Sequence, residues 1–342
     1  MSNNGNLNPE FSTPNDAQPA ATQQSVIRKI FFGPNGLRAG WRFAIYVALS
    51  FVLGYVFRYL RQAVYPLPKR VPGEGLEPVR EIIVRGSGFL VAAVAAWIMA
   101  RIEREKWEHY GLPVRRVFSL DSFVGLVWGF VALTFVMGGL WLAGAYRIEG
   151  LALSGGAIWK FAALWGVMFL IVGLLEEFTL RGYPLYTLAS GMGFWPAAIL
   201  TSGLFVAAHL GNPGETWMGL TDVFLIGVFL CLTLWRTGDL WFAVMFHASW
   251  DWGLTYFYSV PNSGATATGH LFNVQVQGPK WLSGGSAGPE GSIINLFFDL
   301  LGFVVFLAFY RHRKWVGMND RRKTVQTSAS VTLDASALTG NS

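Results

Sequence analysis

The sequence has little charge and almost no cysteine. Asp, Glu, Lys and Arg make up 13% of its 342 residues, about half the share found in an ordinary soluble domain. So few charges cannot solvate a chain that is 53% hydrophobic, which excludes a soluble domain, a coiled coil and a disordered polymer. Cys231 is the single cysteine, so an intramolecular disulfide and a cysteine-based metal site are excluded as well. The composition predicts an all-α, polytopic membrane helix bundle.

The two ends of the chain lack apolar runs. Residues 1–25 and those from about 317 are polar, and we expect two disordered tails, 1–30 and 315–342, with no cleavable signal peptide at the start. Between them we predict an eight-helix membrane domain over residues 38–314. The net charge of +6 is explained by basic cytoplasmic loops, so we expect a lipid bilayer and no nucleic acid as a partner.

Eight apolar runs approach the spanning length of about 20 residues. They lie at about 41–60, 82–100, 122–144, 157–180, 194–210, 218–235, 239–258 and 292–310. Lys and Arg gather before the first run, between the second and third, and after the last, which predicts that both termini lie on the cytoplasmic side of the membrane. We expect this membrane to be a bacterial plasma membrane. The Gly- and Ser-rich segment 259–291 would then lie outside, as a flexible flap or a linker. Gly125 and Gly129 form a possible helix-packing motif.

The first group of ionisable residues inside an apolar run is Glu176, Glu177 and Arg181. A charge in lipid costs about 2.5–3.5 kcal/mol on insertion scales, so each one needs a reason. Adjacent carboxylates point about 100° apart on a helix, and Glu177 and Arg181 have the spacing of an ion pair. Glu176 is then the free carboxylate. The alternative is a helix end emerging at the cytoplasmic surface.

Two more polar groups lie in later runs. His209 follows Phe205 by one helical turn, and His247 precedes Asp251 by one turn. Singly, His209 fits a core or interfacial histidine, and His247 with Asp251 fits a polar pair that stabilises the bundle. Together with Glu176 they are hard to explain as packing, because the chain has five histidines in all. Asp299, in the middle of the last run, is a weaker outlier that we expect to pair within the bundle, and Asp222 and Asp239 lie near helix starts.

The series Glu-Glu-x-x-x-Arg, Phe-x-x-x-His and His-x-x-x-Asp on successive apolar runs resembles the CPBP (Abi) intramembrane protease family, which includes the type II CAAX prenyl endopeptidases. The similar core covers about 155–260. The resemblance implies an endopeptidase that hydrolyses a peptide bond in or beside the membrane, with a membrane protein or peptide as substrate. The CAAX-processing branch has Asn where this chain has Asp251. An ionised Asp only accepts hydrogen bonds, so Asp251 must be protonated, orient His247 or bind a metal.

On this interpretation Glu176 is the general base, His209 holds the attacking water and His247 stabilises the oxyanion. Asp251 fixes the tautomer of His247, and the supporting residues are Glu177, Arg181 and Phe205. A metal-dependent version has zinc held by His209, His247 and one carboxylate, either Glu176 or Asp251. We favour the metal-free version, because a carboxylate one turn from a histidine is well placed to orient its ring.

Two other functions stay open. The same fold could serve as a non-catalytic membrane immunity or scaffold protein, and a proton-coupled transporter would also use intramembrane Glu and His. The catalytic interpretation meets one geometric difficulty. Glu176 lies near the inner end of its predicted helix, and His209 lies near the outer end of the next. The two meet only if the fourth helix continues past Arg181, to about Leu188, or if the fifth helix is shallow.

Overall fold

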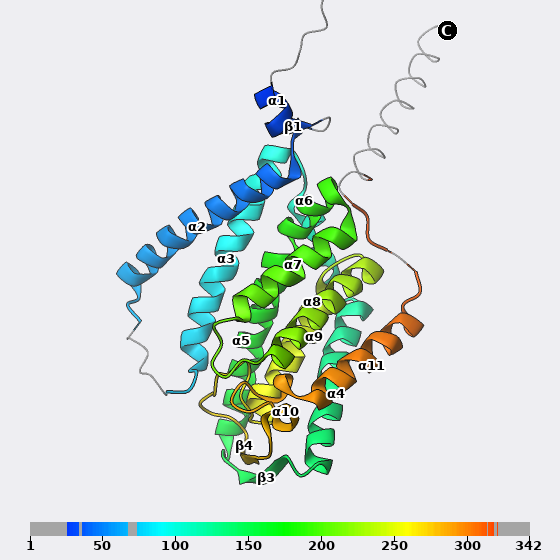
Figure 1. Ribbon diagram of the computed structural model, residues 1–342. Helices are drawn as coiled ribbons and strands as arrows, with labels where there is room; N and C mark the ends of the chain where they lie inside the picture. Colours follow the sequence, from blue (N-terminus) through cyan, green and yellow to red (C-terminus); the bar gives the residue numbers. More distant parts are fainter. Residues whose placement is uncertain (1–25, 34–35, 68–73, 313, 318–319, 321–342) are drawn as a thin grey trace, which may run out of the picture.

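The structure, a computed structural model, describes residues 26–33, 36–67, 74–312, 314–317 and 320. Helices dominate it (Figure 1), which confirms the predicted all-α class. A helix occupies each of the eight apolar runs, within a few residues of the predicted bounds. These are α2 (Ala39–Val64), α3 (Pro78–Glu103), α4 (Leu120–Leu142), α5 (Gly156–Arg181), α7 (Phe194–His209), α8 (Trp217–Thr237), α9 (Trp241–Trp252) and α11 (Ile293–Phe309).

Within the described residues, five segments are long and apolar enough to cross a membrane. They are α2, α3, α4, α8 and the 37-residue stretch Gly156–Met192, which joins α5 to α6 (Tyr183–Met192). The helices α7 and α11 are apolar but shorter. The chain is an integral membrane protein, because lipid is the one solvent that suits such long apolar surfaces.

The bend between α5 and α6 explains how Glu176 and His209 can lie at the same depth in the membrane. Pro184 stands in the first turn of α6 and cannot donate to the helix ladder, so the long stretch bends at Gly182 without ending. After Gly193 the chain reverses direction, and the 16 residues of α7 run antiparallel to the stretch before it. The distance along the chain from Glu176 to Met192 is about the same as the length of α7. Glu176 and His209 therefore reach a similar depth, as the predicted extension past Arg181 requires.

Glycines allow α9 to lie deep in the bundle. Gly125 and Gly129 on α4 face the carbonyl oxygens of Phe242 and Phe246 so closely that a Cβ atom would collide with them. On α5, a Cβ at Gly173 would lie 2.6 Å from the carbonyl oxygen of Val244. The predicted Gly-x-x-x-Gly contact is thus present, and α9 is held between α4 and α5 by backbone packing.

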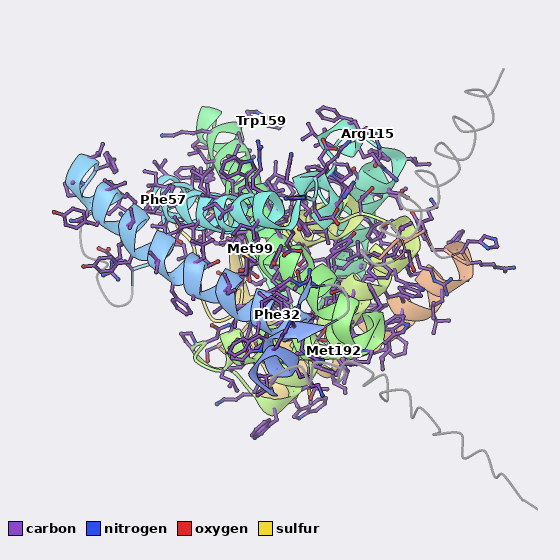
Figure 2. The ribbon with its side chains drawn as sticks, turned by 90° about the horizontal axis from the view of Figure 1, so that it is seen from above. Phe32, Phe57, Met99, Arg115, Trp159 and Met192 are labelled. Carbon is purple, nitrogen blue, oxygen red and sulfur yellow. The ribbon has the colours of Figure 1, made fainter. Side chains whose placement is uncertain are left out.

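The helix α2 stands apart from the rest. It packs on α3 and α6 near its beginning and then diverges from the bundle (Figure 1). The view from above shows the part near Phe57 projecting beyond the other helices (Figure 2). Its second half is largely exposed, including Phe51, Tyr55 and Val64, and this apolar surface suits contact with lipid.

The segment after α9 is folded. The π-helical turn η3 (Gly253–Phe257) extends α9, and β4 (Phe272–Val276) pairs antiparallel with β3 (Tyr146–Leu151), which precedes α5. The short helix α10 (Lys280–Ser283) and the 3₁₀ turn η4 (Pro289–Gly291) follow. This segment, predicted as a flap or a linker, closes one end of the bundle, whereas α1 (Val26–Phe31) and the chain after α11 lie at the other end (Figure 1).

Two tail boundaries need correction. Residues 26–31, at the end of the predicted N-terminal tail, form α1, and Phe31 stacks on Trp41. Trp315, which opens the predicted C-terminal tail, is buried and stacks on Trp235. Both aromatic contacts bury apolar area. The prediction missed them because each tail is polar as a whole, and these few apolar residues lie at its boundary. The remaining minor elements are β1 (Phe32–Gly33), β2 (Gly36–Leu37), η1 (Trp107–Tyr110) and η2 (Val114–Arg116); the rest of both predicted tails, apart from residues 316, 317 and 320, lies outside the described residues.

Candidate active site

A cavity of about 550 Å³ lies among α3, α5, α7, α8 and α9, against the segment after α9. All four residues predicted to be catalytic line it: Glu176, His209, His247 and Asp251. Phe205 lines it as well, whereas Glu177 and Arg181 do not. The structure therefore brings together the polar residues of three different apolar runs.

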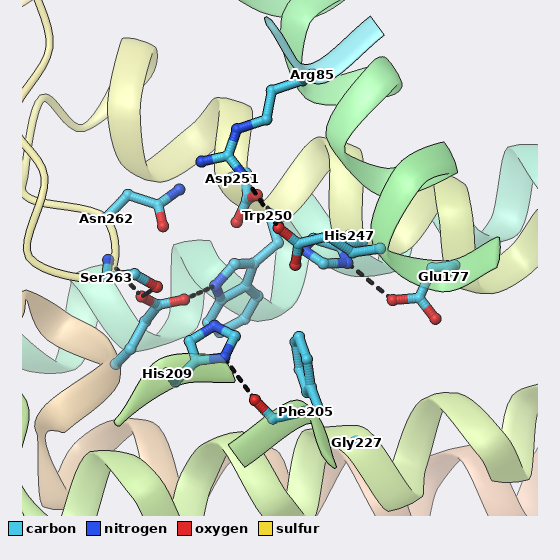
Figure 3. A network of polar contacts seen from close by, with 12 residues as sticks. Arg85, Glu177, Phe205, His209, Gly227, His247, Trp250, Asp251, Asn262 and Ser263 are labelled. Atoms are coloured by element: carbon cyan, nitrogen blue, oxygen red, sulfur yellow. Dashed lines mark hydrogen bonds and ion pairs between the residues drawn. The ribbon is translucent and has the colours of Figure 1, made fainter. Parts of the chain in front are cut away.

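His247 and Glu176 meet at the centre of the site. The Nε2 atom of His247 lies 3.7 Å from Glu176 Oε2 and 3.4 Å from Asp251 Oδ2. From α3, Arg85 places Nη1 3.8 Å from Glu176 Oε1, and Figure 3 shows its side chain entering the site. These separations are too long for good hydrogen bonds. Within the described part of the chain no group donates a hydrogen bond to Glu176, so its carboxylate can accept one from water.

Glu177 holds the other side of the His247 ring. Its Oε1 atom lies 2.9 Å from His247 Nδ1 and 3.2 Å from Arg181 Nη1. Both Glu177 and Arg181 are fully buried. The predicted ion pair of Glu177 with Arg181 is present. Asp251 of the same helix lies beside Nε2, where an orienting carboxylate is expected, and Glu177 of α5 occupies Nδ1.

The adjacent carboxylates differ because of their direction on the helix. Successive side chains of a helix project about 100° apart, so Glu176 points into the cavity while Glu177 points at α9. An imidazole donates from both nitrogens only when it carries two protons. With carboxylate oxygens beside both ring nitrogens, the surroundings of His247 favour that form.

Phe205 links the cavity to the buried ion pair. Its ring lies 4.6 Å from the guanidinium carbon of Arg181 and 4.5 Å from the centre of the His209 ring. His209 Nδ1 lies 2.8 Å from the carbonyl oxygen of Phe205. A carbonyl only accepts, so Nδ1 carries the proton and Nε2 is left as an acceptor. This tautomer suits a histidine that holds the proton of a water molecule (Figure 3).

Zinc does not fit this arrangement. A zinc site needs three protein ligands about 2.0–2.2 Å from one point. The described residues contain no group of three or more His, Cys, Asp or Glu side chains placed to hold a metal ion. Glu177 already contacts His247 at Nδ1.

The cavity also contains acidic residues that the sequence pattern did not assign. Asp222 of α8 and Asp299 of α11 share the amide of Asn295, at 2.8 and 3.1 Å, which places Asp299 in the pairing expected of it. Glu290 of η4 accepts from Trp250 Nε1 at 3.2 Å and from the backbone N–H of Ser263 at 3.0 Å. A glutamate in a loop is normally exposed to solvent, so the position of Glu290 in the cavity could not be predicted from the sequence.

Burial, followed by the nearby negative charge of Asp251, raises the pKa of Glu290 to about 7. Its partners Trp250 and Ser263 are neutral, and they stabilise a carboxylate less than a cation would. Glu290 thus titrates close to neutral pH. Glu290, which lies outside the membrane-spanning helices, therefore keeps its proton to a higher pH than an exposed glutamate does.

No curated protein matches the chain. One family model does, over residues 158–253, close to the core predicted at about 155–260. The matched segment contains Glu176, His209, His247 and Asp251, while α3 and the segment after η3 lie outside it. The resemblance predicted from the three motifs is confirmed over this segment, which matches the family described as type II CAAX prenyl endopeptidase Rce1-like.

Proposed function

We propose that the chain is an intramembrane endopeptidase of the CAAX type, which hydrolyses a peptide bond with a water molecule activated by Glu176. The observation that carries this proposal is the carboxylate of Glu176, which accepts no hydrogen bond within the described residues and lies beside His247 among cavity residues of the family-matched segment. A carboxylate with only distant ion-pair partners is costly among apolar helices, and general-base catalysis explains why it is there.

Glu176 and His209 provide the two sides of a water site. Glu176 accepts one proton of the water as the oxygen attacks the carbonyl carbon. His209 accepts a hydrogen bond from the second proton at Nε2, because Nδ1 is committed to Phe205. This orientation directs a lone pair of the water oxygen at the substrate.

His247 stabilises the tetrahedral oxyanion. Its Nδ1–H is fixed by Glu177, which leaves the Nε2–H free to donate into the cavity. Before substrate binds, that proton lies between Glu176 and Asp251. The oxyanion then replaces these carboxylates as the better-placed acceptor. Asp251 holds the donor in place and does not itself donate, which is how this chain accommodates Asp in the position of Asn.

The test is a Glu176→Gln variant, with the exposed Glu149→Gln of β3 as the matched control. A farnesylated peptide that ends in three residues after the modified cysteine serves as substrate, with a fluorophore and a quencher on either side of the scissile bond. We expect Glu176→Gln to lose about 10²–10⁴-fold in rate, while Glu149→Gln is unchanged.

The same experiment separates the other two functions. A wild-type chain that cleaves neither this peptide nor its unprenylated form would refute the peptidase. Proton uptake into vesicles that disappears in Glu176→Gln would then favour a transporter. A chain without either activity would favour a scaffold or immunity protein.

A further inference from the structure

Hydrolysis of an amide requires a proton for the departing nitrogen, and none of the roles assigned so far provides a dedicated acid for it. Glu176 collects the proton of the attacking water, His209 accepts from that water, and His247 donates to the oxyanion. An amine leaves as a neutral molecule only if an acid protonates it as the C–N bond breaks. Either Glu176 returns the proton that it has taken from the water, or a further group of the cavity that holds a proton at working pH donates it.

Glu290 is built into the cavity wall. The turn η4 carries it, and Gly284 and Gly288, both with positive φ, allow the chain to pack tightly just before that turn. Gly264 donates its backbone N–H to the carbonyl oxygen of Ala287 at 2.8 Å, which joins the two ends of the segment after η3. The carboxyl group is thus fixed at the cavity and is not a mobile surface charge.

The contacts of Glu290 favour a protonated carboxyl group. Trp250 Nε1 donates to Oε1, and the Ser263 backbone donates to Oε2, with Ser263 Oγ 3.3 Å from Oε2. The Ser263 hydroxyl oxygen can accept the proton of a neutral carboxyl group. No Arg or Lys forms an ion pair with Glu290 within the described residues.

Most of the surrounding charges act in the same direction. Asp251 of α9 raises the pKa of Glu290, His247 of the same helix lowers it to a smaller extent, and Asp222 of α8 faces it as well. Further charged or titratable groups on the cavity wall are Asp299 of α11, His209 of α7, Glu176 of α5, and Glu81 and Arg85 of α3. Carboxylates outnumber cations among these groups, and the low dielectric strengthens their repulsion. The pKa of Glu290, about 7, agrees with this geometry.

We propose that Glu290, in its protonated form, donates the proton to the leaving amine. This role rests on the peptidase activity proposed above. A C–O bond forms between the water oxygen and the carbonyl carbon, and Glu176 receives the water proton. The C–N bond then breaks with its electron pair on nitrogen, which takes the proton of Glu290. Glu290 is left as a carboxylate, and the proton on Glu176 returns to it through solvent in the cavity.

The decisive experiment compares two leaving groups. One farnesylated peptide has an amide at the scissile bond, and its partner has an activated ester whose alkoxide leaves without protonation. We expect Glu290→Gln to slow the amide about 10²–10⁴-fold in kcat and the ester less than about 10-fold, because only the amide needs the acid. Glu176→Gln should slow both, since both need the water. The control Glu149→Gln should slow neither.

The pH profile provides a second test. The wild-type amide reaction should slow as pH rises through about 7, as Glu290 loses its proton. The ester reaction should not show this limb, and Glu290→Gln should lack it with both substrates. Infrared difference spectra between pH 5.5 and 9 should show protonated carboxyl absorption that Glu290→Gln reduces, whether or not any peptide is cleaved; Asp222 and Asp299 of the same cavity can account for the remainder.

Each result has a distinct meaning. Equal losses with the amide and the ester, or an unchanged amide rate in Glu290→Gln, would overturn the role of Glu290 while leaving the peptidase intact. A wild-type chain that cleaves neither substrate would overturn the proposed function, and the proton-donor role with it. A carboxyl band of unchanged amplitude in Glu290→Gln would show that Glu290 does not hold the proton, which also overturns the inference.

Discussion

Replacing Arg181 with alanine should strongly destabilise the bundle. The guanidinium lies in the interior, where Nη1 contacts Glu177 Oε1 at 3.2 Å and Nη2 donates to the Gly227 carbonyl oxygen at 3.3 Å. It also covers the ring of Phe205. Removing one partner of a buried pair leaves an uncompensated charge and costs about 3–5 kcal/mol. The free energy of unfolding should fall by that amount, a change of about 10²–10⁴ in the unfolding equilibrium.

The assay is unfolding in mixed micelles with a rising mole fraction of SDS, followed by tryptophan fluorescence. Arg181→Lys retains the charge but loses the planar fork, so an intermediate loss is expected. The double variant Glu177→Gln/Arg181→Ala removes the stranded carboxylate and still offers an amide oxygen to His247. It should be more stable than Arg181→Ala alone, with a coupling energy of more than about 1 kcal/mol.

Two results would refute this reasoning. A loss below about 1 kcal/mol in Arg181→Ala would mean that Glu177 and Arg181 behave as an exposed pair. Strict additivity of the two single variants would mean that they do not interact, and Glu177 would then need another explanation for its burial.

Three further predictions concern packing, pH and metal. Gly129→Ala should lower the free energy of unfolding by about 1–3 kcal/mol, because the added Cβ collides with the Phe246 carbonyl oxygen. Gly138→Ala on the same helix is the control, since its Cβ meets open space. Equal losses in the two variants would contradict the close packing of α4 on α9. The raised pKa of Glu290 should make the free energy of unfolding depend on pH. The contribution of Glu290, about 3 kcal/mol at most, should be complete below about pH 4.5 and lost as pH rises through about 7. An equally steep decline in Glu290→Gln would assign the pH dependence to another group. Chelators should leave peptide hydrolysis unchanged, and metal analysis should find no stoichiometric zinc; activity lost on zinc removal and restored on its return would show that the metal-free mechanism is wrong.

The sequence predicted the parts of the molecule that depend on local pattern. Eight helices were foreseen because apolar length is a strong signal in a membrane protein, and the pair of Glu177 with Arg181 follows from one helical turn. The break at Gly182 was expected only as an extension past Arg181. Its exact place depends on how Pro184 and the buried face of α6 pack against neighbouring helices.

The sequence pattern could not predict contacts between residues that lie far apart along the chain. Nothing along the chain links Glu177 to His247 of α9, so Asp251, the nearer residue in sequence, was given the task of orienting the ring. Glu290 was missed for the same reason, because a loop carboxylate becomes unusual only when Trp250 and Ser263 surround it. Arg85 gives no such signal in the sequence either, because only the packing of α3 on α5 brings it to Glu176.

The wall of the cavity comes from two kinds of sequence. The family-matched segment supplies Glu176, His209, His247 and Asp251, while Arg85 and the turn with Glu290 come from outside it. Substrate preference can therefore diverge through α3 and the closing segment without any change to the residues that activate water. A chimera that exchanges residues 259–292 between two such proteins should transfer selectivity and the alkaline pH limit together, because one short stretch of chain contributes both surfaces.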